Sequence, residues 1–286
     1  MLLAVPNVSE GHQASVIERI AAGFAPARVL DRHSDADHNR SVLWLAAPQA
    51  ELAPALASGA RAAADSIDLN AQSGIHPRVG ALDVAPVVYR DHEERGAAIA
   101  TALTAAALIG ELGIPVFLYG ELATDPSRTE RAGLRRGGPA ALGKRIAEGE
   151  LQPDYGPAEI HPTAGATLVT ARPPLVAFNV DLDSTDLALA TTIAAELRER
   201  DGGLPGVRAL GLWLEARGRV QVSMNVHDYE AAPLSEIVGR IAARAPIREA
   251  ELVGLAPGAA LADFPADIPL RNRRTIEEAL EGAQSS

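Results

Sequence analysis

The chain has 286 residues, enough for one large domain or two smaller ones, each able to bury a sizeable core. Its 47% hydrophobic and 22% charged residues are typical of a globular protein, and no apolar run approaches the roughly 20 residues that span a bilayer. The absence of cysteine excludes disulfides, thiolate catalysis and cysteine-ligated zinc. A net charge of -11 argues against nucleic acid as a partner, because phosphate binding needs a basic face.

The N-terminal residues predict a strand followed by a helix. The chain opens with MLLAVPNVSEGHQ, which has no basic segment and no long apolar stretch. We therefore expect a buried strand over residues 2–5 rather than a signal peptide, and a cytoplasmic protein. Ser9 is predicted to cap a helix that carries Val16, Ile17 and Ile20 on one face.

A polar segment, RHSDADHNRS, connects two predicted strands at residues 32–41. Imidazole and carboxylate groups suit zinc, iron or manganese, so the segment could hold a metal in a metal-dependent hydrolase. The spacing matches no established ligand signature, however, and a solvated turn of the same composition is the stronger interpretation. The candidate ligands are His33, Asp35, Asp37 and His38.

Residues 67–90, IDLNAQSGIHPRVGALDVAPVVYR, join a predicted helix to a predicted strand through a turn that carries His76. Pro77 has a fixed φ and restricts His76 to extended geometry, while Gly74 and Gly80 allow positive φ on either side. The turn would therefore hold a titratable imidazole rigidly at the edge of a sheet. A histidine whose hydrogen bonds are satisfied by its own loop is the alternative interpretation.

The order of predicted elements indicates the fold class. The second half gives strand, helix, strand, strand, helix, strand, which is the order of a ferredoxin-like unit, and the first half gives much the same order with additions. We predict an α+β fold of two ferredoxin-like (β-α-β-β-α-β) subdomains, with facing sheets and helices outside. Predicted domains are residues 1–172, 173–255 and a tail, 256–286, with a disordered Gln-Ser-Ser end. Further strands are predicted over residues 27–31, 41–47, 83–89, 114–119, 175–182, 207–215, 220–225 and 248–253, and helices over 51–64, 92–112, 233–244, 275–281 and after Ser184.

The stretch around His76 resembles, without a gap, the GxHPRxGALDVxPF core of the glutamate formiminotransferase (glutamate formimidoyltransferase) family. His76 matches the catalytic histidine of that family. The departures are Ile75, where some members carry Glu, and Val87, where an aromatic residue is common. The matching residues are Gly74, His76, Pro77, Arg78, Gly80, Ala81, Leu82, Asp83, Val84 and Pro86.

Two further segments resemble the same family. The polar segment is similar to its DxDHNRTV sequence, in which Asn39 and Arg40 match best. The resemblance implies that Asn39 and Arg40 bind substrate and that this segment lies close to the His76 loop. Residues 153–165 resemble a PDFGP…G run that lines the folate site in the family, although Ala164 stands where some relatives have tryptophan. The substrate-binding residues that this run implies are Gly156, Pro157, Pro162 and Gly165, with His161 and Thr163 as polar residues of the same run.

The resemblance, which covers residues 1–255, implies transfer of a formimidoyl group from N-formimidoyl-L-glutamate to tetrahydrofolate, in histidine degradation and one-carbon metabolism. Amines leave poorly unless protonated, so His76 is expected to serve as general acid and base. Tetrahydrofolate is the implied co-substrate. No metal, nucleic acid or membrane partner is implied, a homodimer is compatible with the resemblance, and no cyclodeaminase domain is expected. A non-catalytic folate-binding relative, the metal-dependent hydrolase and a formylglutamate donor are the alternatives.

Arginines must receive the carboxylates of folate and glutamate, because the chain as a whole is acidic. Arg78 lies two residues beyond His76, so it could hold a carboxylate while His76 acts on the adjacent nitrogen. Pairing of Arg78 with Asp83 inside the turn is the alternative. A glycine-rich segment offers further candidates, on a solvated face or in a carboxylate clamp: Arg128, Arg131, Arg135 and Arg136.

Overall fold

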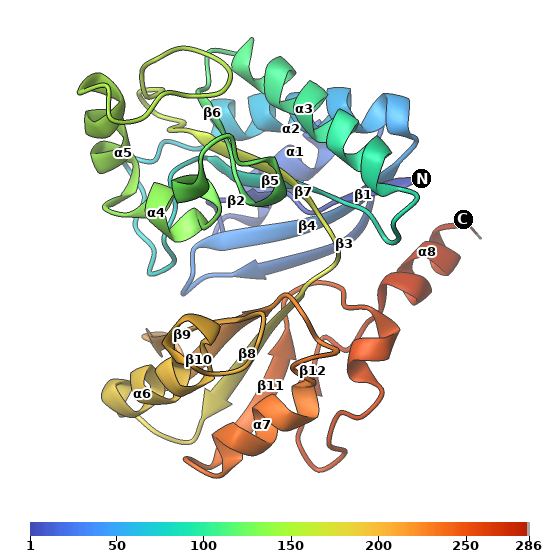
Figure 1. The fold of residues 1–286 in the computed structure, drawn as a ribbon, viewed down its shortest axis with the longest axis vertical. Coiled ribbons are helices and arrows are strands. Elements are labelled where there is room, and N and C mark those ends of the chain that lie inside the picture. The colour runs from blue at the N-terminus through green and yellow to red at the C-terminus, as the bar shows by residue number, and fades with distance from the viewer. Residues whose placement is uncertain (285–286) are drawn as a thin grey trace. The chain divides into compact units, whose positions relative to one another are not determined.

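The computed structural model describes residues 1–284, and the chain divides into two compact units, Met1–Pro173 and the residues from Pro174 onward. Each unit has its own sheet and its own hydrophobic core (Figure 1). In this described part of the chain no helix combines the length and the apolar character that a membrane span requires.

The first unit contains a seven-stranded sheet whose order is β1-β4-β2-β5-β7-β6, with β3 beside β4. The elements β1, α1, β3, β4, α2 and β5 follow the predicted β-α-β-β-α-β order, and α3, β6 and β7 are the additions. Strand β7 pairs in parallel with β5 and β6, whereas the other pairs are antiparallel. The strands are β1 (Leu2–Ala4), β2 (Asn7–Val8), β3 (Arg28–Asp35), β4 (Arg40–Ala47), β5 (Leu82–Val88), β6 (Val116–Leu118) and β7 (Thr167–Arg172).

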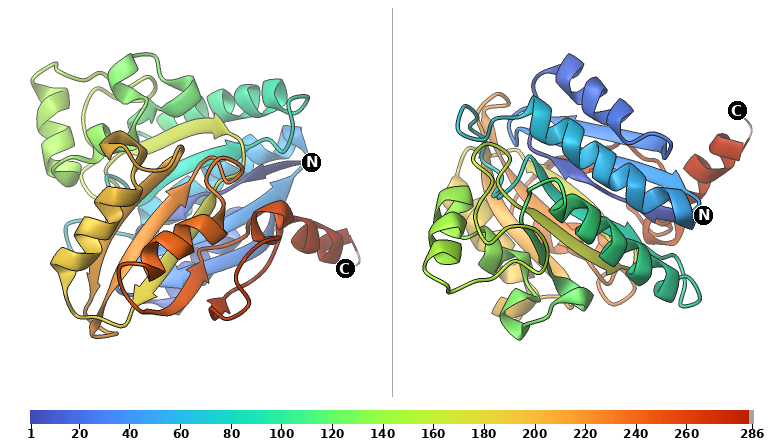
Figure 2. Two further views of the ribbon diagram at one scale, coloured as in Figure 1. Left: turned by 60° about the horizontal axis from the view of Figure 1, so that its bottom comes forward. Right: turned by 90° about the horizontal axis from the view of Figure 1, so that it is seen from above.

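Alternate side chains of this sheet enter two different cores, because successive residues of a strand point to opposite faces. Ala85 and Val169 pack against the three long helices, which lie side by side across the sheet (Figure 2, right). Their neighbours Val84 and Leu168 pack instead with Leu134 of a short helix. The helices are α1 (Ala14–Gly23), α2 (Gln49–Ser66), α3 (Arg95–Gly110), α4 (Arg131–Arg135) and α5 (Gly138–Ala147), with 3-10 turns η1 (Gly120–Leu122) and η2 (Pro126–Arg128).

The second unit confirms the predicted order β8, α6, β9, β10, α7, β11. Its five-stranded sheet has the order β12-β11-β8-β10-β9 and is antiparallel except for the pair of β11 with β12. The elements are β8 (Val176–Leu182), α6 (Leu187–Leu197), η3 (Glu199–Asp201), β9 (Val207–Leu214), β10 (Arg219–Val226), α7 (Leu234–Ala242), β11 (Ile247–Leu252), η4 (Gly258–Leu261), β12 (Leu270–Arg271) and α8 (Ile276–Gln284).

The segment from residue 256 onward, which the sequence analysis set apart as a tail, lies within the second unit. Ala256 and Leu261 are buried in the core of that unit, and β12 adds a strand to its sheet. Gln284 ends α8 rather than beginning a disordered end, and the remaining two residues of that prediction lie outside the described residues.

Both predicted serine caps are wrong. Asp186, not Ser184, caps α6 by accepting hydrogen bonds from the backbone N–H groups of Ala188 and Leu189. Ser9 lies before the start of α1, and its hydroxyl donates to the carbonyl oxygen of Gly80 at 2.7 Å. Ser9 therefore ties the N-terminal segment to the loop that carries His76.

Gly59 of α2 is expected to resist substitution because a Cβ atom there would overlap the ring of Phe24, which is fully buried. Alanine favours a helix over glycine by about 1 kcal/mol, but overpacking costs about 1–3 kcal/mol. Gly59→Ala should therefore lower the free energy of unfolding, measured by chemical denaturation. Gly96→Ala in α3 is the control, because a Cβ there meets nothing within 4 Å, and it should be neutral or stabilising. Equal effects of the two substitutions would contradict the packing argument.

Candidate active site

The loop before β5 is attached to the segment that leads into β7 of the first unit. Its Gly80 forms a backbone bridge with Gly165, and Leu69 donates its backbone N–H to the carbonyl oxygen of Thr163 at 3.0 Å. The backbone approach is so close that a Cβ on Gly80 would overlap the carbonyl oxygen of Ala166. The structure thus brings the end of the predicted folate run, residues 161–165, directly beside the His76 loop.

Within the described residues, Nδ1 of His76 is engaged in a hydrogen bond and Nε2 is available. Nδ1 lies 2.8 Å from the carbonyl oxygen of Pro77. A carbonyl oxygen can only accept a hydrogen bond, so Nδ1 carries the proton, and the neutral ring presents the lone pair of Nε2. The ring is half-buried, and it lies beside the ring of His38 with centroids 5.9 Å apart. His76 therefore has the tautomer that a general base requires.

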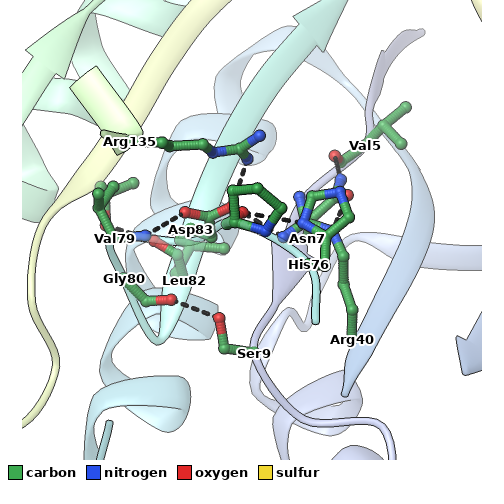
Figure 3. Close-up of polar contacts among 12 residues, drawn as sticks. Val5, Asn7, Ser9, Arg40, His76, Val79, Gly80, Leu82, Asp83 and Arg135 are labelled. Atoms are coloured by element: carbon green, nitrogen blue, oxygen red, sulfur yellow. Dashed lines mark hydrogen bonds and ion pairs between the residues drawn. The ribbon is translucent and has the colours of Figure 1, made fainter. Parts of the chain in front are cut away.

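Asp83, at the start of β5, is the fully buried centre of an ion-pair cluster. Its Oδ2 accepts from Arg40 Nη1 at 2.7 Å and also from Arg135 Nη2, and its Oδ1 accepts from the backbone N–H of Val79 at 2.8 Å (Figure 3). Burial alone would raise the pKa of Asp83, but the two guanidinium groups outweigh it and hold this pKa well below its usual range. Asp83 is therefore ionised at neutral pH.

The same cluster acts on His76. The surrounding protein removes water from the imidazole and lowers its pKa well below the ordinary value, although part of the ring remains accessible. The positive charges of Arg40 and Arg135 lower this pKa further, while Asp83 opposes them. Figure 3 shows the imidazole beside Arg40. His76 is consequently neutral at pH 7, the form that can accept a proton.

Asn39 and Arg40, both predicted to bind substrate, have their side chains engaged within the protein. The carboxamide of Asn39 accepts from Gly11 N–H at 2.8 Å and donates to the carbonyl oxygen of Ser73 at 2.7 Å. Arg40 donates through Nε to Asn7 Oδ1 at 3.0 Å in addition to its pair with Asp83. Both residues therefore lie at the His76 loop, as expected, where they brace it.

Arg78, two residues beyond His76 in the same loop, has spare hydrogen-bonding capacity. Its Nη2 donates to the carbonyl oxygen of Gln72 at 2.8 Å, while its buried Nη1 has no hydrogen-bond partner within the described residues. The alternative in which Arg78 pairs with Asp83 is wrong, because across residues 1–284 the ion pairs of Asp83 are with Arg40 and Arg135.

The four predicted metal ligands of the polar segment do not form a site with one another. In the described part of the chain, no three of them bring ligand atoms within 4.8 Å of one another. Asp35 instead accepts a hydrogen bond from the backbone N–H of His38 at 2.9 Å and so closes the turn between β3 and β4. The solvated-turn interpretation also needs correction, since Asp35 and His38 are buried.

The four predicted clamp arginines separate in space. Arg128 pairs with Asp154 at 3.0 Å, and the guanidinium of Arg131 lies over the ring of Tyr119. Arg136 is exposed, whereas Arg135 forms an ion pair with Asp83 in the cluster beside His76.

The residues of the predicted folate run also lie in two different places, Gly156 and Pro157 in one and residues 161–165 in the other. Gly156 packs against the backbone of Gly110 and Ile114 at the end of α3, and Pro157 follows it in the chain. The carbonyl oxygens of Pro162 and Thr163 receive hydrogen bonds from the loop before β5. The ring of His161 accepts from Ala164 N–H at 3.0 Å, which closes its own turn.

Glu10 is a residue of this site that the sequence analysis did not identify. It is buried, and Oε1 accepts the backbone N–H groups of His12 and Gln13 while Oε2 accepts from Gln72 Nε2 at 2.8 Å. An acidic residue just before a helix was the available local signal. Its contact with Gln72 spans 62 residues, and no local sequence pattern predicts it.

Two family models match the chain: the N-terminal subdomain of the formiminotransferase domain over residues 1–172, and the formiminotransferase domain over residues 177–277. The second match extends beyond residue 255, where the resemblance had been placed to end. Glutamate formimidoyltransferase of Streptococcus pyogenes serotype M1 is 38% identical over 91% of this chain and 90% of its own, and that of Thermoplasma acidophilum is 37% identical over 91% and 89%. Formimidoyltransferase-cyclodeaminase of Gallus gallus is 36% identical, and the chain spans 50% of its length.

Replacing Asp83 by asparagine should strongly destabilise the protein, because it leaves two buried guanidinium groups without their carboxylate. Removing one partner of a buried ion pair costs about 3–5 kcal/mol. The free energy of unfolding at pH 7 should fall by that amount in Asp83→Asn and stay unchanged in Asp65→Asn, an exposed control on α2.

The pH dependence gives a second measurement of this contribution. The folded-state pKa of Asp83 is lowered, so its stabilisation is fully present above the unfolded-state pKa of about 4 and is lost as pH falls from there towards the folded value. The difference between wild type and Asp83→Asn should shrink below pH 4. A difference that is constant down to pH 2 would contradict the assignment.

Proposed function

This chain belongs to the formiminotransferase family, and we propose from that premise that it transfers the formimidoyl group of N-formimidoyl-L-glutamate to tetrahydrofolate, with His76 as general acid and base. The observation that carries the catalytic assignment is a neutral imidazole whose Nδ1 is held by Pro77, leaving Nε2 available. Of the seven histidines of the chain, His76 also matches the family's catalytic position.

The reaction exchanges one amine for another at a single carbon. Nitrogen 5 of tetrahydrofolate attacks the amidine-like carbon and gives a tetrahedral intermediate. Nε2 of His76 accepts the proton that the attacking amine loses and returns a proton to the glutamate nitrogen, so that the carbon–nitrogen bond to glutamate breaks and glutamate leaves as a neutral amine. The group is transferred with no net change in protons, so one residue suffices for both steps.

A neutral resting state matches the first step of this sequence. A base must be unprotonated when the substrates bind, and the lowered pKa of His76 keeps it so at neutral pH. A protonated imidazole would also repel the cationic form of the amidine donor. The adjacent Arg40–Asp83–Arg135 cluster is consistent with this role, since its excess of one positive charge disfavours protonation of the imidazole.

Arg78 is our candidate for the residue that holds a substrate carboxylate. A buried guanidinium nitrogen without a partner favours an acceptor from a bound ligand, and a carboxylate matches guanidinium geometry. Such a local cation is needed because the chain carries a net charge of -11.

The position of folate is supported by the segments that lie side by side, and no single residue carries it. Residues 161–165 lie beside the His76 loop through hydrogen bonds of Leu69 and Asn70, which is compatible with a shared substrate site. Ala164 is buried, so it presents no surface on which a pteridine ring could stack. His33 and Asp35 have ligand atoms within 4.8 Å of each other, but among the described residues Asp37 and His38 do not join them, so the polar segment by itself does not form the site of a metal-dependent hydrolase. A turnover assay separates the transferase from a non-catalytic folate-binding relative.

Removing the imidazole should abolish most transfer. His76→Ala is expected to lower kcat by at least about 100-fold, the usual contribution of a positioned acid-base group, with little loss of stability because the ring is partly exposed. Formation of formimidoyl-tetrahydrofolate is the assay, run in parallel with N-formylglutamate as donor. His92→Ala, at an exposed histidine of the same unit, should retain full activity. Near-wild-type turnover by His76→Ala would remove this residue from the mechanism.

Neutralising Arg78 should weaken donor binding. A hydrogen bond to a charged group is worth about 1.5–3 kcal/mol, so Arg78→Gln should raise KM for the glutamate donor about 10- to 100-fold while the Tm changes little. Arg61→Gln, at an exposed arginine of α2, is the control. A lower Tm with an unchanged KM would show instead that Arg78 only braces its loop through Gln72.

A further inference from the structure

Helix α4 delivers one charged side chain to the neighbourhood of His76. This five-residue helix is anchored by the buried Leu134, which packs with Leu142 and Ile146 of α5. The next residue, Arg135, ends the helix, and its side chain is 9% exposed and reaches Asp83 Oδ2. Arg135 and Asp83 are 52 residues apart in the chain, so the contact exists only because α4 packs over this face of the sheet.

The two arginines of the cluster have different local roles. Arg40 belongs to β4 and also donates to Asn7, so it is part of the sheet. Arg135 comes from a separate short helix, and without it Asp83 would still have Arg40 and the backbone N–H of Val79. Arg135 is therefore the partner whose removal changes the charge of the cluster while leaving the carboxylate satisfied.

The charge of the cluster bears directly on His76. With both arginines present, Asp83 is surrounded by an excess of one positive charge, which disfavours a second positive charge on the imidazole. With Arg40 alone, the pair is neutral overall. The other charged or titratable group that acts on the ring is His38, from the turn between β3 and β4, whose ring centroid lies 5.9 Å from that of His76. Arg78 lies in the same loop as His76, but its charge interaction is with Asp83.

We propose that Arg135 is a positioning residue for the transfer reaction: through its ion pair with Asp83 it keeps His76 in the neutral form that accepts a proton. Its effect on rate rests on the proposed function, whereas its effect on His76 can be measured without turnover. The lowered pKa of His76, for which Arg135 is one of the causes, agrees with this role.

The test is a titration of the His76 ring protons by NMR in the full chain, with the signal assigned by its loss in His76→Gln. Arg135→Gln should raise the midpoint by about one pH unit, the size of effect expected from one nearby charge. Arg136→Gln removes the same charge from the adjacent, exposed residue and should leave the midpoint within about 0.3 units, because solvent screens exposed charges. Arg135→Lys keeps the charge and should also stay within about 0.3 units of wild type.

The pH profile of kcat/KM gives the corresponding kinetic readout. Its acid limb should move to higher pH in Arg135→Gln by the same amount as the NMR midpoint, and stay in place in Arg136→Gln. A folded Arg135→Gln with an unchanged His76 midpoint would overturn the proposal, as would equal shifts in both variants. If Arg135→Gln does not fold, a raised midpoint in Arg135→Lys would overturn it instead. Absence of transfer in the wild type, with the NMR shift present, would refute the proposed function and leave the effect of Arg135 on the protonation of His76 intact.

Discussion

The buried carboxylate of Asp83 is the interaction on which the site depends. It joins β5 to β4 through Arg40 and to α4 through Arg135, and it also accepts the backbone N–H of Val79 in the His76 loop. A buried ion pair is weak support for stability as such, because desolvation offsets the attraction between its charges. Its position beside His76 gives it an electrostatic role that a hydrophobic replacement of the same size could not supply.

A second set of contacts holds the loop in place from the N-terminal side. Ser9 bonds to Gly80, Glu10 to Gln72, and Asn39 to both Gly11 and Ser73. The side chains of Ser9, Glu10 and Asn39 are buried and paired, which fixes the loop because an unpaired buried polar group is costly. The partly accessible imidazole is thus carried by a loop whose backbone is held by hydrogen bonds to buried side chains. Such a loop positions a catalytic group and leaves its Nε2 available.

Several elements followed directly from local patterns. The β-α-β-β-α-β order of both units, the strand that leads out of the His76 turn and the family assignment all come from periodicity or from a contiguous motif, and the structure and the comparisons confirm them. The predictions that Ser9 and Ser184 cap helices are wrong because a serine near a helix start can form its hydrogen bond elsewhere, as Ser9 does with Gly80. The prediction of a single carboxylate clamp in the arginine-rich segment is wrong because its side chains have different partners, such as Asp154 for Arg128 and Asp83 for Arg135.

What the sequence by itself determined was the local geometry and the chemical groups: a proline-restricted histidine in a glycine-bracketed turn, within a motif typical of one family. Only the tertiary structure decided which charges surround that histidine. Arg40 and Arg135 meet Asp83 across 43 and 52 residues, and neither spacing has a local signature. The protonation of His76 depends on distances through space and on the removal of water, and both arise only when β4, β5 and α4 pack together.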